Sequence, residues 1–265
     1  MKSNVKKYYD EKSTDYDANN ELLYFKVYDA VTWKYTEPYV PKDSGALVLD
    51  AAGGTGKWSI PIAKCGPKVV LTDLSDGMLD VAREKIKKSG LGKRVDVRKG
   101  DVRGLDFEDE TFDMVFVDHA LCFIQEQGQV VSELVRVLKR NCPLVISGQN
   151  RYVLSLSLLK DDVDLSLKIL QNEVQFAMRG LLKVYPLSPE EFRLLLEKSG
   201  VRVDKIIGKG VTMPMALPQE RFWTKDYSKD FFDRVLKIEL DLCEKPDALA
   251  LAGHFQGIGY KRGGV

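Results

Sequence analysis

Four short apolar runs in the first half of the chain each end in, or near, an acidic residue. They cover residues 47–50, 69–73, 95–102 and 112–118. Such runs predict strands, and helix-like stretches follow the first run from Lys57 and the second run up to about Lys88. This alternation predicts an open parallel α/β sheet, whose carboxyl edge is where ligands bind. The acids that would meet at that edge are Asp50, Asp73, Asp101 and Asp118.

A glycine-rich turn after the first run is the most informative stretch of the sequence. Its residues after Asp50 include Ala52, Gly53, Gly54 and Gly56. Glycine is needed there because a side chain would hold a ligand away from the backbone. A strand, a tight glycine loop and a helix start form the element that binds nucleotide-like ligands. Asp73 lies about twenty residues further on, where a carboxylate can accept from both ribose hydroxyls.

The pattern changes after a fifth apolar run at residues 143–148. Residues 151–184 have no strand-like alternation, and their leucines recur at roughly helical spacing, which predicts one or two helices. Ser188 and Pro189, followed by two acids, predict a helix start. The remaining predicted elements are a strand at 201–208, an amphipathic helix at 231–243 and a last strand at 253–261.

These pieces together resemble the class I S-adenosylmethionine-dependent methyltransferases, in particular the small-molecule branch related to ubiquinone/menaquinone methyltransferases. The matching pieces are 50–56, 73–75 with Met78, 100–102, 111–115 and 133–139. One piece alone is weak, whereas the ordered set at these spacings is specific. The resemblance covers residues 5–150 well and 185–262 loosely. It implies a Rossmann-like, doubly wound sheet of seven mostly parallel strands with a final antiparallel hairpin, and S-adenosylmethionine as cofactor.

The resemblance also implies a role for each matching residue. The loop from Ala52 to Gly56 would pass under the methionine and ribose, and Asp73 would bind the ribose hydroxyls. Leu74 and Met78 would flank the adenine. The implied cofactor-binding residues are Tyr16, Asp50, Ala52, Gly53, Gly54, Gly56, Asp73, Leu74, Met78, Asp101, Val102 and Asp118.

Within that set, Asp101 would accept from the adenine amino group beside Val102, and Asp118 would lie near the methionine end. Tyr16, the tyrosine of a Tyr-Asp pair, would reach the methionine carboxylate. One residue departs from the family, which usually has glycine where this chain has Ala52. Alanine tolerates most backbone conformations except positive φ, so we expect a small adjustment with binding retained.

The resemblance also gives a domain organisation. Residues 1–40 are predicted to be helical and rich in aromatic side chains, and they would fold over the cofactor site as a lid. The further predicted parts are a cofactor-binding core at 41–150, a helical cap insertion at 151–185, and the C-terminal part of the sheet with an inserted loop and helix at 186–265. A packing pair of helices without substrate contact is the alternative to the cap.

A dinucleotide-binding dehydrogenase is the rival interpretation of the glycine loop. Its Gly-x-Gly-x-x-Gly fingerprint needs a third glycine for close packing of helix on strand. Here Gly54 and Gly56 are followed by Lys57, Trp58 and Ser59, so the third glycine is missing. The fingerprint also does not usually have an acid such as Asp50 just before the loop. The methyltransferase interpretation is therefore favoured.

Composition narrows the function further. The 265 residues contain 40 basic and 39 acidic side chains, and this balance argues against nucleic-acid binding. No apolar stretch approaches 18 residues, so no membrane span is expected. The N-terminus lacks the apolar segment of a secretion signal, and four scattered cysteines fit a reducing cytoplasm. The two histidines are far apart in sequence, so no metal site is expected.

Methyl transfer from a sulfonium needs alignment and dehydration more than acid catalysis, because the leaving group departs neutral. A base is needed only where the acceptor must lose a proton. His119, directly after Asp118, is the candidate base, and a structural histidine that caps the loop is the alternative. His254 begins the last predicted strand and would face either the core or the cleft.

The sequence therefore predicts a cytoplasmic methyltransferase that acts on a small molecule, without nucleic-acid partners and with its oligomeric state left open. A protein or RNA methyltransferase is an alternative, although no Asn-Pro-Pro-Tyr-like motif follows the fourth strand. A non-catalytic S-adenosylmethionine-binding module is the other alternative. The presence of all the acids expected at the site argues against it, because a site that has lost its activity would be expected to lose one or more carboxylates. An apolar lining would favour a hydrophobic or aromatic acceptor; its candidate residues are Phe176, Met178, Met213, Phe222 and Trp223.

Overall fold

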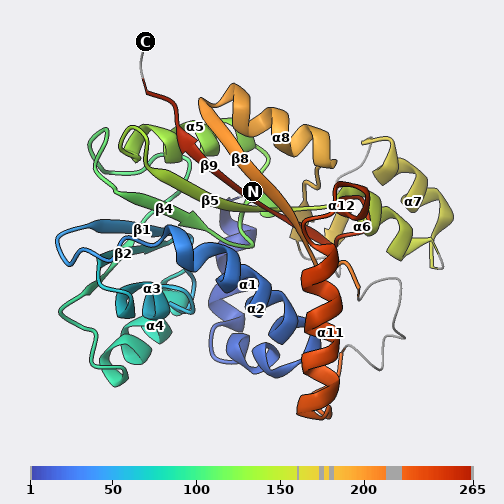
Figure 1. Ribbon diagram of the computed structural model, residues 1–265, viewed down its shortest axis with the longest axis horizontal. Helices are drawn as coiled ribbons and strands as arrows, with labels where there is room; N and C mark the ends of the chain where they lie inside the picture. The colour runs from blue at the N-terminus through green and yellow to red at the C-terminus, as the bar shows by residue number, and fades with distance from the viewer. Residues whose placement is uncertain (1, 160, 173–175, 179–181, 213–222, 264–265) are drawn as a thin grey trace.

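A seven-stranded sheet runs through the middle of the molecule and carries helices on both faces (Figure 1). The computed structural model describes residues 2–159, 161–172, 176–178, 182–212 and 223–263. The strand order is β3-β2-β1-β4-β5-β9-β8. The strands are β1 Leu47–Ala51, β2 Lys68–Asp73, β3 Val95–Lys99, β4 Met114–Val117, β5 Pro143–Gln149, β8 Val201–Lys209 and β9 His254–Lys261.

Strand β9 alone runs in the direction opposite to the other strands of the sheet. It pairs antiparallel with both β5 and β8, whereas the pairs from β3 to β5 are all parallel. The chain leaves β1 toward β2 and β3, then returns past β1 to β4 and β5, so the order reverses beside β1. Ligands bind at this switch point in doubly wound sheets. The predicted fold class is confirmed.

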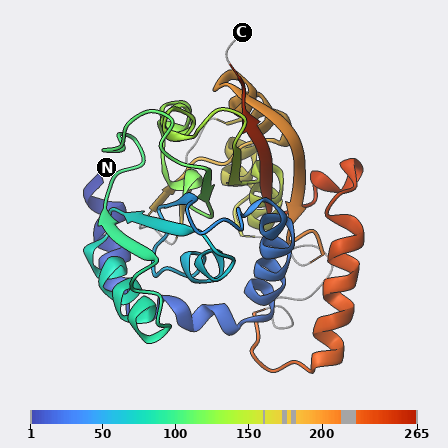
Figure 2. The ribbon, with the colours of Figure 1, turned by 60° about the vertical axis from the view of Figure 1, so that its left-hand side comes forward.

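The central strands are apolar because both of their faces are covered. Val48, Leu49 and Ala51 in β1 are fully buried, as a strand between two helical layers requires. Helices α5 Gln127–Val137 and α8 Pro189–Lys198 pack on one face of the sheet. Helices α3 Ser59–Lys64 and α4 Asp76–Lys88 pack on the other, beside side chains of α2 Leu23–Thr36 (Figure 2).

The predicted helix start at Ser188 is present as a capping box. The Ser188 hydroxyl accepts from the Glu191 amide, and the Glu191 carboxylate accepts from the Ser188 amide. This reciprocal pair satisfies two amides that the first helical turn would otherwise leave without partners.

Three carboxylates attach the N-terminal segment to the sheet and its helices. The segment contains α1 Lys2–Lys12, η1 Tyr16–Glu21, α2 and η2 Glu37–Tyr39. Asp10 accepts from the Ser75 hydroxyl at 2.6 Å, where α4 begins. Asp17 accepts from Thr55 of the glycine loop at 2.8 Å and pairs with Lys85 of α4 at 2.6 Å. Asp29 pairs with Lys57 at 2.6 Å.

The insertion after β5 contains more than the predicted helices. Helices α6 Arg151–Leu158 and α7 Val163–Leu170 are present, but the strands β6 Phe176–Met178 and β7 Leu182–Val184 follow and pair antiparallel. The absence of strands predicted for 151–184 is therefore wrong. Three-residue strands are too short to show alternation. Leu182 and Val184 are fixed by burial against Cys122 and Phe123 of η3 Leu121–Phe123 instead.

Three predicted boundaries in the core also move. The third strand ends at Lys99, because Asp101 forms a turn that bridges to Gly104. The fourth begins at Met114, and the helix after the glycine loop begins at Ser59. Helices α11 Lys229–Leu242 and α12 Pro246–Leu249 precede β9.

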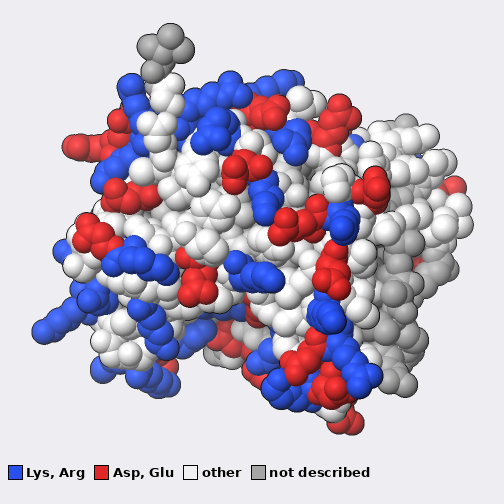
Figure 3. Space-filling view, viewed as in Figure 1, with Lys and Arg blue, Asp and Glu red and all other residues white. Residues whose placement is uncertain are grey.

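Charge is mixed over the visible surface. In Figure 3 basic and acidic side chains alternate over most of the face, while the region of α6 and α7 is largely uncharged. Within the described residues, no helix combines the length and apolar character needed to cross a bilayer. The same residues contain no cluster of three or more side chains suited to a metal ion.

Gly66, between α3 and β2, offers a test of the fold. Its φ is +139°, and an added Cβ would collide with the backbone oxygen of Lys42. We expect Gly66→Ala to lower the free energy of unfolding by about 1–3 kcal/mol in urea titrations. Gly92→Ala is the matched control, because its Cβ would enter open space. Equal stability of the two variants would contradict this packing.

Candidate functional site

Two cavities meet at the carboxyl edge of the sheet, beside the switch point. Their volumes are about 200 Å³ and about 780 Å³. They adjoin each other, because several residues line both of them. The shared lining residues are Tyr9, Tyr16, Ala52, Gly54, Asp118, His119 and Phe123.

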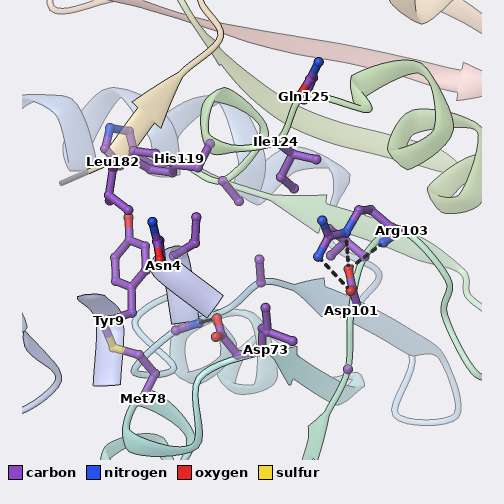
Figure 4. A pocket seen from close by; sticks show the side chains of 18 of the residues that line it. Asn4, Tyr9, Asp73, Met78, Asp101, Arg103, His119, Ile124, Gln125 and Leu182 are labelled. Atoms are coloured by element: carbon purple, nitrogen blue, oxygen red, sulfur yellow. Dashed lines mark hydrogen bonds and ion pairs between the residues drawn. The ribbon is translucent and has the colours of Figure 1, made fainter. Parts of the chain in front are cut away.

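The smaller cavity has an acidic floor and an apolar wall. In Figure 4, Asp73 and Met78 lie on one side of it, and Asp101 lies further along the same edge. Tyr9 from the N-terminal segment stands beside Met78, and Leu182 from β7 lies across from them, near His119. The N-terminal segment and the insertion after β5 therefore both enclose this cavity.

The glycine loop is built so that its backbone borders the cavity. An added Cβ on Gly53 would lie 2.8 Å from the Asp50 carboxyl and 2.9 Å from Leu71, so no side chain fits there. At Gly54, with φ +54°, a Cβ would meet nothing within 4 Å. The Gly54 amide donates to Asp73 at 2.9 Å, and the Ser75 amide donates to the other carboxylate oxygen at 2.9 Å. The loop and Asp73 thus form one rigid unit.

Ala52 adopts the conformation that was expected to exclude alanine. Its φ is +54°, so the loop keeps its left-handed residue instead of adjusting. His119, at the end of β4, has φ +55°. Both residues line both cavities, and strained backbone of this kind is maintained only where surrounding contacts over-determine it.

Asp50 is buried beneath the loop with a weak set of partners. Its carboxylate accepts from the Ser59 hydroxyl at 2.5 Å. Burial raises the pKa of Asp50 to about 7, and the nearby Asp118 and Asp73 carboxylates add to the shift. Burial also raises the pKa of Asp73, against the hydrogen bonds from Ser75 and Gly54. Added positive charge in the cavity would favour the ionised form of both groups.

Asp101 is held in a fork by Arg103. Both carboxylate oxygens accept from the guanidinium, each at 2.9 Å, and the Arg103 amide also donates to it at 3.1 Å. The carboxylate is thereby fixed at the rim of the smaller cavity.

Asp118 accepts from three side chains that come from different parts of the chain. One oxygen accepts from Tyr28 at 2.9 Å and from Lys209 at 2.8 Å, and the other accepts from the Trp58 indole at 3.1 Å. Burial alone would raise the pKa of Asp118, but the Lys209 ammonium outweighs it and holds the pKa well below 3.8. Lys209 itself is fully buried and lies 4.0 Å over the Tyr28 ring.

His119 and His254 meet in the wall of the larger cavity. Their Nε2 atoms are 3.1 Å apart, and the Nδ1 atom of His254 is 3.3 Å from the Tyr24 hydroxyl. The His119 amide donates to the Ser147 hydroxyl at 2.6 Å. Burial lowers the pKa of His119 from 6.5 and that of His254 much further. Both imidazoles are therefore neutral at neutral pH.

The larger cavity is mainly aromatic where it extends away from the glycine loop. Its aromatic lining residues beyond the shared ones are Tyr8, Tyr24, Phe25, Tyr28, Trp58 and Trp223. Of the apolar lining expected from the sequence, Trp223 is in place. Met213 and Phe222 lie outside the described residues, as do the side chains of Phe176 and Met178. Leu154 and Leu156 of α6 also reach this cavity.

The structure brings the expected site residues together, with one exception. All of the twelve except Gly56 line one or both cavities. A Cβ on Gly56 would instead contact Leu71 and Ala82, so this glycine serves packing of the loop against β2 and α4. Residues that the sequence did not indicate are Tyr9, Tyr24, Tyr28, Trp58, Arg103, Phe123 and Lys209.

Comparison with known proteins agrees with this geometry. Residues 48–141 match the methyltransferase domain family. That match includes the glycine loop and all four acids and ends before β5. Most of the residues that line the larger cavity therefore lie outside the matched region.

Two curated relatives match part of the chain. A demethylmenaquinone methyltransferase of Lactiplantibacillus plantarum is 33% identical over 146 residues, which are 54% of this chain and 61% of that protein. A ubiquinone/menaquinone biosynthesis C-methyltransferase of Pasteurella multocida is 33% identical over 49% of this chain and 50% of its own length. The chain thus spans about half to three-fifths of these relatives.

A solved structure shares the fold over nearly the whole chain. The S-adenosylmethionine-dependent methyltransferase of Thermotoga maritima covers 97% of this chain with a TM-score of 0.60, and this chain covers 99% of it. The two sequences are 18% identical, so the likeness concerns the fold.

The ion pair under the site gives a stability prediction. Lys209→Met leaves the Asp118 carboxylate buried without its counter-charge, so we expect a loss of about 3 kcal/mol in the free energy of unfolding at pH 7. Asp118→Asn combined with Lys209→Met removes both charges, and its loss should be smaller than the sum of the single losses. Urea titrations of the three variants measure these values.

The same variant has a predictable pH dependence. The folded pKa of Asp118 is lowered, so the stabilisation is present above pH 3.8 and is lost as pH falls through the folded pKa. In Lys209→Met the counter-charge is gone, so burial raises the pKa of Asp118. As pH falls, Asp118 is therefore protonated in the variant before it is protonated in the wild type, and protonation removes the unpaired buried charge. The stability gap between wild type and variant should therefore narrow as pH falls from 7 to 4. A constant gap would count against the ion pair.

Proposed function

We propose that the chain transfers a methyl group from S-adenosylmethionine to a small organic acceptor, because residues 48–141 match the methyltransferase domain family. The observation that carries the proposal is the pair of adjoining cavities lined by the glycine loop and the acids Asp73, Asp101 and Asp118. The bound cofactor would supply an electrophilic methyl group on a cationic sulfur.

The residues present fit such a ligand. Gly54 leaves open space beside its backbone, which is the cradle that a nucleoside needs. The proposed partner of the ribose hydroxyls is Asp73, whose two oxygens are already fixed by backbone amides. Leu74, Met78 and Val102 line the smaller cavity and offer apolar contact for a flat base. Asp101 would accept from its amino group.

The larger cavity would hold the methionine end and the acceptor. Tyr16 and Asp118 line both cavities, and we assign them to the methionine end. Asp118 and the buried Asp50 place two carboxyl groups beside this end, and their ionised forms favour a cationic donor. His119 is the proposed base for acceptors that lose a proton.

An aromatic ring is the acceptor class that this lining favours. Tyr24, Phe25 and Trp223 provide flat apolar faces on the side away from the glycine loop. The printed names of the relatives add support for a quinone-type ring. The near balance of 40 basic and 39 acidic residues disfavours RNA, and the intact acid set disfavours a binding module without catalysis. Four free thiols support a cytoplasmic location.

Asp73 is the residue whose loss should matter most for the cofactor. We expect Asp73→Ala to weaken binding of S-adenosylmethionine and S-adenosylhomocysteine about 100-fold, because two charge-assisted hydrogen bonds disappear. Asp96→Ala is the matched control, since Asp96 is an exposed aspartate of the neighbouring strand β3 that pairs with Arg98. Calorimetric titration measures both, with NADH as a third ligand. Binding of NADH alone would overturn the proposal.

Asp50 makes binding of a cationic ligand depend on pH. Its pKa is about 7 in the free protein, so part of the population must lose a proton when a cation enters. Affinity for S-adenosylmethionine should rise about tenfold from pH 6 to pH 8. S-adenosylhomocysteine lacks the sulfonium charge and should show a smaller rise. Asp50→Asn should flatten both profiles, and an unchanged slope in that variant would contradict the assignment.

A further inference from the structure

The only two histidines of the chain form one buried hydrogen-bonded pair. His119 follows β4 and His254 begins β9, so the pair joins two strands that are not neighbours in the sheet. His254 is 8% exposed, and its ring lies 5.4 Å from the Tyr28 ring. Beyond it, Tyr24 of α2 completes a row of three polar groups.

This row can carry its hydrogens in two directions. If the Tyr24 hydroxyl donates to His254, then His254 donates through Nε2 and the proton of neutral His119 lies on Nδ1. If His254 donates through Nδ1 to Tyr24, then His119 donates through Nε2 and its Nδ1 carries a lone pair. Only the second direction makes His119 a base, since a neutral imidazole has one donor and one acceptor nitrogen.

The cavity is the remaining partner of His119. Its ring lines both cavities, its Nε2 is engaged by His254, and no described residue is hydrogen-bonded to its Nδ1. The backbone strain at φ +55° and the bond from its amide to Ser147 hold the ring in place. An acceptor bound in the larger cavity would therefore meet Nδ1.

We propose that His254 is a positioning residue that fixes His119 in its basic tautomer and receives the second proton of a two-imidazole relay. The proposal rests on the proposed methyl transfer. As the acceptor atom forms its bond to the methyl carbon, the carbon–sulfur electron pair stays on sulfur. The acceptor proton passes to His119 Nδ1, and the proton on His119 Nε2 moves to His254 Nε2.

The charged groups around the pair act on an imidazolium in opposite directions. The carboxylate of Asp118 favours the charged form, whereas the ammonium groups of Lys209 and Lys57 oppose it. The groups that face the pair are Tyr24 and Tyr28 of α2, Lys57 after the glycine loop, Asp118 at the end of β4 and Lys209 of β8. Burial lowers the pKa of both histidines, so the relay is empty before each turnover and releases its proton afterwards.

Nitrogen-15 NMR of histidine-labelled protein tests the tautomers without any acceptor. With two histidines in the chain, His254→Gln assigns the signals. We expect the proton on Nε2 of His119 and on Nδ1 of His254 in the wild type at pH 7. Tyr24→Phe should mix the tautomers, and Tyr39→Phe should not, because Tyr39 is a half-buried tyrosine bonded to Asp204 instead. A proton on His119 Nδ1 in the wild type would overturn the proposal.

The turnover number kcat distinguishes a proton relay from a purely structural role of His254. Glutamine at 254 can accept from His119 Nε2 but cannot take up a proton, so it keeps the tautomer and blocks the relay. With 1,4-dihydroxynaphthalene as acceptor, we expect His254→Gln to lower kcat about tenfold and His254→Phe about 100-fold. Binding of S-adenosylmethionine should stay within about threefold, because His254 does not line the smaller cavity, where the nucleoside is proposed to bind.

Two further outcomes are informative. In His254→Phe the acid limb of the kcat profile should move to lower pH, because the protonated His119 loses its hydrogen-bond acceptor. A kcat of His254→Gln within twofold of the wild type, with cofactor binding intact, would overturn the relay. Absence of cofactor binding in the wild type would count against the proposed function instead, and the NMR result would then decide the histidine pair by itself.

Discussion

The buried ion pair between Asp118 and Lys209 is the contact on which the site depends. It links the end of β4 to β8 across two intervening strands, and Tyr28 of α2 and Trp58 next to α3 donate to the same carboxylate. A carboxylate with three donors has little freedom to move. Because four elements converge on it, the floor shared by both cavities is rigid before any ligand binds, and the cost of burying two charges is offset by this preorganisation.

Much of the cofactor side could be predicted because its determinants are local. Each strand delivers its acid by ending there, and parallel pairing then brings Asp50, Asp73 and Asp118 to one edge without further information. The glycine loop is equally local, since its shape follows from residues in one turn. The exceptions are small: Gly56 faces α4 instead of the cavity, and Ala52 keeps a positive φ because the loop is held by its neighbours.

The acceptor side could not be predicted in the same way, because its determinants are contacts between distant segments. In the sequence Lys209 is an ordinary strand lysine, and only the packing of α2 over it buries it in the site. His254 reaches the site only because β9 pairs with β5. The strands β6 and β7 are set by burial of Leu182 and Val184 on η3, not by their own pattern. A single sequence contains no local signal for any of these pairings.

The position of β9 also has a consequence for how the chain folds. β8 is made before β9, yet its only neighbour in the sheet is β9, which must first insert between β5 and β8. Until then both strands have open edges, and such edges invite pairing with other chains. The insertion closes long loops and is therefore a slow step. β9 also carries His254. A nascent chain could therefore complete its cofactor side well before the part of the larger cavity that His254 lines. A ribosome or chaperone that shields the open edge of β5 would protect the chain during that time.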